Sequence, residues 1–99
     1  MASEIDLNFH WDEDKAAANF KKHRISFDEA KTVFGDPFSV TIDDPAHSAH
    51  EYRFVDIGTS TSRMILAVAY VDRGRNIRLI SCRKATRAER KIYEEGKDL

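Results

Sequence analysis

Cysteine, proline and glycine are scarce in this sequence, and the shortage of cysteine excludes two kinds of structural element. The 99 residues contain one cysteine, two prolines and four glycines. Because Cys82 is alone, neither an intramolecular disulfide nor a structural zinc site of several thiolates can form. We therefore expect a protein of the reducing cytoplasm, and the sequence indicates no cofactor.

Long apolar runs are also missing. The longest, Met64 to Val71, is well short of the roughly 20 residues needed to cross a bilayer. The first 12 residues contain acids but neither lysine nor arginine, so we expect no signal peptide and no membrane anchor. With 41% apolar and 33% charged residues, the chain is predicted to fold as one small domain spanning residues 1–99.

The charge of the chain is unevenly distributed. The formal net charge is −1, but residues 1–50 carry five basic and ten acidic side chains, whereas residues 51–99 carry eleven basic and seven acidic ones. Eight basic residues and one acid lie between Arg73 and Lys91. This local excess indicates an anionic partner, although a merely solvated surface with local ion pairs explains the charge equally well.

The N-terminal third carries signals for a strand and two helices. Residues 5–11 alternate apolar and polar side chains, as a half-buried strand does. Asp12 is a suitable N-cap for a helix that runs to about His23. The capping box Ser26-x-x-Glu29 starts a second helix, which Gly35 and the proline after it end. The buried faces of the two helices are expected to carry Ala16, Ala17, Phe20, Phe27, Ala30, Val33 and Phe34.

The rest of the chain is predicted to form a meander of strands and a last helix. Strands are expected over residues 38–42, 51–58, 63–71 and 76–84, joined by short polar turns. A second capping box, Thr86-x-x-Glu89, starts a terminal helix with Ala88 and Ile92 facing inward. The order is β-α-α-β-β-β-β-α, so we predict an α+β fold with a mainly antiparallel sheet.

Four segments resemble the BrnT family of toxins of type II toxin–antitoxin systems. They are F-H-W-D-E-D-K-A-A-A-N-F-K-K-H (9–23), I-S-F-D-E-A-K-T-V-F-G-D-P (25–37), H-E-Y-R (50–53) and I-R-L-I-S-C-R-K-A-T-R-A-E-R-K-I-Y (77–93). The resemblance implies a RelE-like fold and a ribonuclease activity that arrests translation. It also implies neutralisation by a BrnA antitoxin with a ribbon-helix-helix DNA-binding part.

One position departs from the family pattern. The family usually has glycine after the histidine that ends the first helix, whereas this chain has Arg24 after His23. Glycine adopts the left-handed conformation of a helix stop without strain, so arginine there is expected to cost about 1 kcal/mol.

Arginine is the residue type that best fits RNA cleavage in this sequence. Cleavage at a 2′-hydroxyl builds negative charge on the phosphorane, and the planar guanidinium donates two hydrogen bonds to phosphate oxygens at any relevant pH. The resemblance implies a ribonuclease, and the sequence has no acidic cluster with convincing metal-ligand spacing, so we predict a metal-independent endoribonuclease. The expected catalytic residues are Arg53, Arg63, Arg83 and His50, and the expected substrate-binding residues are Arg78, Lys84, Arg90 and Tyr93.

The alternation along residues 77–84 leaves open which arginine faces the substrate. Both faces of this strand are partly apolar, so the pattern does not distinguish Arg78 from Arg83. Arg83 is preferred because it lies beside a helix N-terminus, which favours anions. The alternative is that some of these arginines form surface ion pairs.

The remaining reactive residues carry weaker signals. His50 is close in sequence to Arg53, so an acid/base group could lie beside an arginine that binds phosphate. An ordinary polar loop explains the same residues as well. His47-x-x-His50 near Asp43 lacks a third ligand at diagnostic spacing, so no metal site is predicted. Cys82 is expected to pack in the core. Tyr93 is the aromatic residue expected to stack on a base or donate a hydrogen bond to RNA, although packing explains it too.

Two functions from different classes fit these features. The first is the ribonuclease toxin, and the second is a non-catalytic basic module that binds an acidic protein segment or nucleic acid. For the toxin we expect a BrnA-like ribbon-helix-helix partner, whose acidic or amphipathic segment covers the basic stretch. Because such antitoxins dimerise, the complex is expected to hold two copies of each chain and to bind promoter DNA through the antitoxin.

Overall fold

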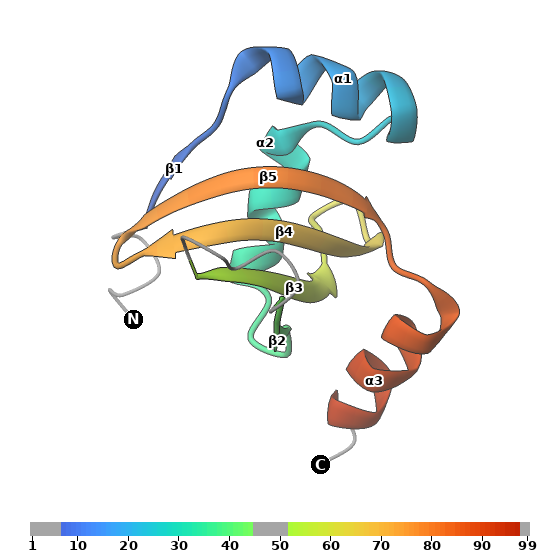
Figure 1. Ribbon diagram of the computed structural model, residues 1–99. Coiled ribbons are helices and arrows are strands. Elements are labelled where there is room, and N and C mark those ends of the chain that lie inside the picture. The colour runs from blue at the N-terminus through green and yellow to red at the C-terminus, as the bar shows by residue number, and fades with distance from the viewer. Residues whose placement is uncertain (1–6, 45–51, 98–99) are drawn as a thin grey trace.

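A five-stranded sheet is the centre of this computed structural model, which describes residues 7–44 and 52–97 (Figure 1). Its strands are β1 (Asn8–His10), β2 (Val40–Asp43), β3 (Arg53–Thr59), β4 (Ile65–Arg73) and β5 (Asn76–Lys84). The strand order is β1-β5-β4-β3-β2. Strands β2 to β5 pair antiparallel with one another, whereas β1 pairs parallel to β5. The sheet is therefore mixed. The predicted antiparallel meander did not include the parallel pairing of β1 with β5.

Helices lie on both sides of this sheet. They are α1 (Glu13–His23), α2 (Phe27–Ala30), the 3-10 helix η2 (Lys31–Gly35) and α3 (Arg87–Lys97). Figure 1 shows α1 and α2 together on one side of the strands, whereas α3 follows the end of β5 and extends away on the other. The element order is the predicted one, and the architecture is a mixed α+β fold.

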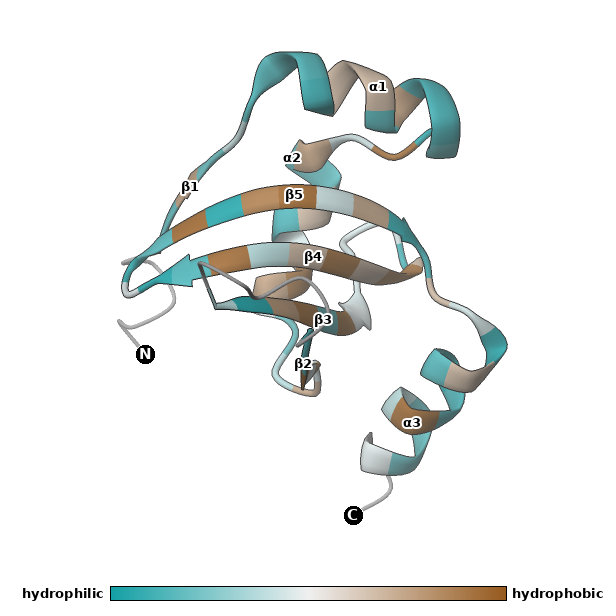
Figure 2. Ribbon diagram, in the orientation of Figure 1, coloured by the Kyte–Doolittle hydropathy of each residue, from teal (hydrophilic) through white to brown (hydrophobic). Residues whose placement is uncertain are grey.

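The core fills the space between β4, β5 and the α2 region. It consists of buried side chains from these elements, namely Ile25, Phe27, Ala30, Val33, Leu66, Val68, Tyr70, Ile77, Leu79 and Cys82. Phe34 joins the two layers, with its ring 4.9 Å from that of Tyr70 and 5.1 Å from that of Phe9. Figure 2 shows the resulting distribution, with hydrophobic residues along β4 and β5 and mostly hydrophilic residues on α1 and α3.

A β-bulge in β5 determines which side chains share a face of the sheet. Tyr70 pairs with Leu79, but Ala69 pairs with Ser81, so Ile80 is an extra residue in β5. The bulge places Leu79 and Cys82 on the same buried face, although they are three positions apart and simple alternation would put them on opposite faces. Simple alternation fails here, because the bulge shifts its phase.

Helix α1 begins as predicted but buries a different residue. The side chain of Asp12 caps it by accepting hydrogen bonds from the backbone N–H groups of Asp14 and Lys15. The predicted buried face is wrong for Ala17 and Phe20, which are exposed, whereas Asn19 is buried. Asn19 is buried because its side-chain amide binds the backbone of β5 at Cys82, beyond the residues of β5 that pair with β1.

The second helix is shorter than predicted. Ser26 caps it by accepting a hydrogen bond from the Glu29 N–H at 3.0 Å. The α-helix ends at Ala30, and the chain continues as the 3-10 helix η2 to Gly35. Its predicted buried residues Phe27, Ala30 and Val33 are confirmed.

Helix α3 starts at its predicted capping box, with both reciprocal hydrogen bonds present. Thr86 N–H donates to the Glu89 carboxylate at 2.8 Å, and Glu89 N–H donates to the Thr86 hydroxyl at 3.2 Å. The predicted inward face is wrong, however, because Ala88 and Ile92 are exposed and Tyr93 is buried. None of the helices in residues 7–44 and 52–97 has the length and hydropathy of a membrane span.

Candidate nucleic-acid interface

Exposed basic side chains gather where β4 begins, β5 ends and α3 starts. Two open hollows adjoin there and share Ala85 and Arg90, one of about 560 Å³ and the other of about 290 Å³. Five basic residues and one acid, Glu94, line them. We call the five the basic cluster, which consists of Arg63, Lys84, Arg87, Arg90 and Lys91.

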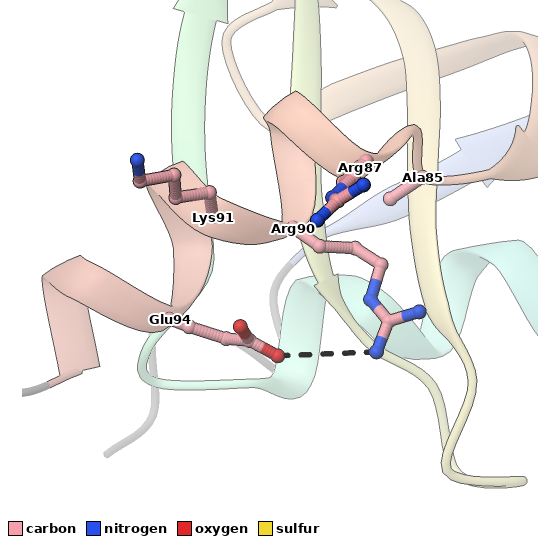
Figure 3. Close-up of a pocket in the computed structure, with 5 residues that line it drawn as sticks. All are labelled: Ala85, Arg87, Arg90, Lys91 and Glu94. Carbon is pink, nitrogen blue, oxygen red and sulfur yellow. Dashed lines mark ion pairs between the residues drawn. The ribbon is translucent and has the colours of Figure 1, made fainter.

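Local structure explains why these residues meet. Ala85 N–H donates to the Ile65 carbonyl at 3.0 Å, which joins the end of β5 to the start of β4. The capping box then starts α3 at once, so its first two turns lie beside the strand ends. Figure 3 shows Arg90 and Glu94 extending to the same side of α3, whereas Lys91 points away.

The acid in the hollow neutralises little of this charge. Arg90 and Glu94 are 4.0 Å apart, and both side chains are 57% exposed, so solvent screens their attraction (Figure 3). The five cations of the basic cluster thus outnumber the one acid that lines the hollows, and such an excess of positive charge suits several phosphates of one nucleic-acid strand.

Arg83 lies beside the basic cluster, but its guanidinium is already bound. Its two terminal nitrogens donate to the two carboxylate oxygens of Glu89 at 2.7 and 3.0 Å. The Arg83 hydrogen bond is the main cause that lowers the pKa of Glu89 to about 2, and the same bond raises the pKa of Arg83. Glu89 is thus a permanent carboxylate near neutral pH and holds Arg83 in a bidentate pair.

The predicted arginines do not form one site. Arg53 pairs with Val71 and Val71 with Arg78, so Arg53 and Arg78 share one row at the far end of the sheet. Thr59, which pairs with Ile65 next to the 60–63 turn, is six residues further along β3, or about 20 Å. Of the eight residues expected to act on RNA, the structure brings together Arg63, Lys84 and Arg90, with Arg83 next to them.

Tyr93 is not accessible as a substrate-binding residue. Its side chain is 2% exposed, and its hydroxyl lies 2.6 Å from a carboxylate oxygen of Asp36 and 2.7 Å from the Thr59 hydroxyl. Its role is to attach α3 to β3 and to the residues before β2. The expectation that it stacks on a base is therefore wrong.

The remaining candidates are the cysteine, the histidines and the side chains that could bind a metal ion. Cys82 is fully buried, so its predicted place in the core is confirmed, and this burial raises the pKa of its thiol to about 12. The predicted residue His50 and its neighbour His47 lie outside the described residues. Within residues 7–44 and 52–97, no three acidic, histidine or cysteine side chains cluster in a way that would hold a metal ion.

Sequence reasoning did not single out Arg87, Lys91 or Glu89 for the RNA site, although Arg87 and Lys91 belong to the basic stretch expected to contact the antitoxin. A signal for the first two was present, because Arg87, Arg90 and Lys91 have the i, i+3, i+4 spacing of one helix surface directly after a capping box. The pairing of Glu89 with Arg83 has no comparable signal, since the glutamate was already explained as a cap.

Comparison with known proteins places the chain in a family. The crystal structure of the Brucella abortus ribonuclease toxin BrnT has the same fold, with a TM-score of 0.59 and 24% identity over 82% of this chain and 99% of that one. A search of curated proteins gave no significant match. A family model described as "Ribonuclease toxin, BrnT, of type II toxin-antitoxin system" matches residues 11–89. This chain belongs to the BrnT family of ribonuclease toxins, whose members act with an antitoxin.

Proposed function

We propose that this protein is a metal-independent endoribonuclease that cleaves cytoplasmic RNA and thereby inhibits translation. The single observation that carries the proposal is the basic cluster, in which five exposed cations line two adjoining hollows. A RelE-like relationship, expected from the resemblance, is part of the same proposal.

The chemistry of the cluster supports RNA as the substrate. Counterion release makes a surface of several cations bind a polyphosphate chain strongly. Arginine donors stabilise the charge that develops on the phosphorane, a task that does not require a metal ion. We assign phosphate binding to Lys84 and Arg90 and charge stabilisation to Arg63. Arg53, Arg78 and His50 remain candidates for a second contact with the RNA.

One observation favours the alternative of a non-catalytic basic module. Arg53 and Arg63 lie about 20 Å apart, and Arg83 is paired with Glu89, so the predicted catalytic arginines do not converge on one phosphate. A module of this kind binds RNA through the basic cluster but breaks no phosphodiester bond.

RNA cleavage in EDTA separates the two functions. The purified chain is incubated with end-labelled single-stranded RNA in excess EDTA, and the products are resolved by length and end chemistry. The proposal predicts cleavage that persists in EDTA and leaves 2′,3′-cyclic phosphate or 3′-phosphate ends. Binding without cleavage would identify the non-catalytic module, and cleavage that requires Mg²⁺ would contradict metal independence.

The antitoxin is proposed to cover the same surface. An acidic or amphipathic segment of a BrnA-like ribbon-helix-helix protein complements the basic cluster and excludes RNA from it. Two copies of each chain then assemble through the antitoxin dimer, which contacts promoter DNA.

Charge reversal tests this contact. Arg87→Glu together with Arg90→Glu is expected to weaken antitoxin binding by at least tenfold, because both cations face the proposed acidic segment. Asp28→Lys, on the exposed surface of α2, is the control and is expected to leave the affinity unchanged. The reverse pattern in a titration would mean that the antitoxin docks on the acidic half instead.

A further inference from the structure

The turn between β3 and β4 presents Arg63 to the basic cluster in a conformation that arginine rarely adopts. The backbone of Arg63 has a φ of 68°, in the left-handed region that favours glycine. Its side chain lines the same hollow as Lys84 and Arg90. A strained residue of this kind persists only where neighbouring structure holds it, and such residues concentrate at functional sites.

Glu29 of α2 provides part of that support. The backbone N–H of Ser62 donates to one oxygen of the Glu29 carboxylate at 3.1 Å, and the Ser62 hydroxyl donates to the other at 3.0 Å. Both contacts act on the residue immediately before Arg63. The carboxylate therefore fixes the Thr61–Ser62 peptide plane and the Ser62 side chain, directly before the left-handed residue.

A second contact, from Thr32 of η2, holds the same turn. The backbone N–H of Thr61 donates to the Thr32 hydroxyl at 3.0 Å, and that hydroxyl in turn donates to the backbone carbonyl of Glu29 at 2.6 Å. Within the turn, Arg63 N–H donates to the Ser60 carbonyl at 2.9 Å. Residues 60–63 are thus attached to α2 and η2 through two consecutive backbone amides.

We propose that Glu29 is a positioning residue of the basic cluster, whose carboxylate orders the 60–63 turn so that Arg63 faces phosphates bound by Lys84 and Arg90. Glu29 acts through Ser62 and Arg63 and does not touch RNA itself. The inference rests on the proposed function, because Arg63 needs positioning only if the cluster binds RNA.

Simple electrostatics predicts the opposite effect, which makes the proposal testable. Removing a negative charge near a basic surface strengthens its attraction for RNA. Removing Glu29 as a positioning residue weakens binding instead, because Arg63 loses its fixed direction. Asp28→Asn is a matched control, since it removes an acid from the neighbouring position of α2, where Asp28 forms an exposed ion pair with Lys31 at 3.5 Å.

The first measurement examines the turn in the absence of RNA. Hydrogen exchange of the Ser62 amide is followed by NMR in the wild type, Glu29→Ala and Asp28→Asn. Glu29→Ala is expected to speed exchange at Ser62 by at least tenfold, whereas Asp28→Asn is expected to leave it unchanged. Unchanged exchange in Glu29→Ala would overturn the proposal, because the turn would then be ordered without the carboxylate.

The second measurement is a double-mutant cycle with a fluorescein-labelled single-stranded RNA in an anisotropy titration. Glu29→Ala and Arg63→Ala are each expected to raise the Kd by about three- to tenfold, and the double variant is expected to be no weaker than Arg63→Ala alone. Glu29→Gln keeps one acceptor oxygen and is expected to fall between the wild type and Glu29→Ala. If Glu29→Ala does not fold, Ser62→Ala and Thr32→Val replace it in the same cycle.

Three outcomes of the cycle would overturn the inference. In the first, the Kd of Glu29→Ala falls, as charge alone predicts; in the second, the effects of the two substitutions on the Kd multiply independently. In either case the RNA site stands and only the role of Glu29 is wrong. If Arg63→Ala leaves the Kd unchanged, the proposed RNA site itself is wrong, and the inference fails with it.

Discussion

The two terminal nitrogens of Arg83 bind the two carboxylate oxygens of Glu89, which also caps α3 through the N–H of Thr86. One glutamate thus joins the end of β5 to the start of the helix that carries most of the basic cluster. The pair fixes the angle at which α3 leaves the sheet, and it leaves Arg83 occupied by a protein carboxylate.

This pair predicts a specific pH dependence of stability. The pKa of Glu89 is lowered from 4.5 to about 2 in the folded protein, so its stabilising effect is complete above pH 4.5 and is lost as the pH falls toward 2. Because Arg83 is 42% exposed, screening limits the effect to about 1–2 kcal/mol. Urea unfolding should therefore show that Glu89→Gln is less stable than the wild type at pH 7 and that the gap narrows below pH 4.5.

The control for this measurement is Glu94→Gln. Glu94 forms an exposed pair with Arg90 at 4.0 Å and has no capping role, so its substitution should change stability little at any pH. A gap between Glu89→Gln and the wild type that stays constant down to pH 3 would mean that the pair does not stabilise the fold.

Asn19 is predicted to be the most important polar residue of the core. Its side-chain nitrogen donates to the carbonyls of Ile25 and Cys82 at 3.1 and 3.0 Å, and its side-chain oxygen accepts from Cys82 N–H at 3.0 Å. Asn19→Ala leaves three buried backbone groups without these partners and is expected to cost about 2–4 kcal/mol in urea unfolding. Lys22→Ala, exposed on the same helix, should cost less than about 0.5 kcal/mol. A similar small loss for both variants would contradict this role.

Arg24 is predicted to strain the end of α1. Its φ of 61° is left-handed, and its N–H donates to the Phe20 carbonyl at 2.7 Å, as in a helix stop. Arg24→Gly removes the strain, so it should be more stable than Arg24→Ala by about 1 kcal/mol. The comparison with alanine is the informative one, because both variants lose the guanidinium that lies 5.9 Å from the Phe20 ring centroid. Equal thermal unfolding midpoints for the two variants would refute the strain.

Local signals in the sequence predicted the helix starts correctly. Asp12, Ser26 and the Thr86–Glu89 box all cap helices as expected, because a cap depends on residues two or three positions apart. The order of strands and helices is also encoded by such short patterns. Buried faces were less predictable where a polar side chain forms long-range hydrogen bonds. Asn19, for example, is buried because it binds the backbone of β5 at Cys82, beyond the residues that pair with β1.

The candidate site was harder to predict because it depends on register and long-range contacts. The bulge at Ile80 reverses the alternation of β5, so Arg78 and Arg83 lie on one face despite their odd spacing. The pairing of β3 with β4 places Arg53 and Arg63 at opposite ends of the sheet. The residues around each arginine give no indication of this separation. Tyr93 follows Arg90 by three residues but turns inward, because Asp36 and Thr59 provide partners for its hydroxyl.

The most direct test of RNA binding by the basic cluster compares two charge reversals of equal size at opposite ends of the sheet. Lys84→Glu with Arg90→Glu alters the basic cluster, whereas Arg73→Glu with Arg75→Glu alters the far end, and each pair changes the net charge by the same amount. The Kd for a fluorescein-labelled single-stranded RNA is measured at one salt concentration, with folding checked by circular dichroism. If the basic cluster binds RNA, the first pair weakens the affinity by at least a hundredfold and the second by less than about threefold. Equal losses, or a larger loss for the Arg73 and Arg75 pair, would contradict the assignment of RNA binding to the basic cluster.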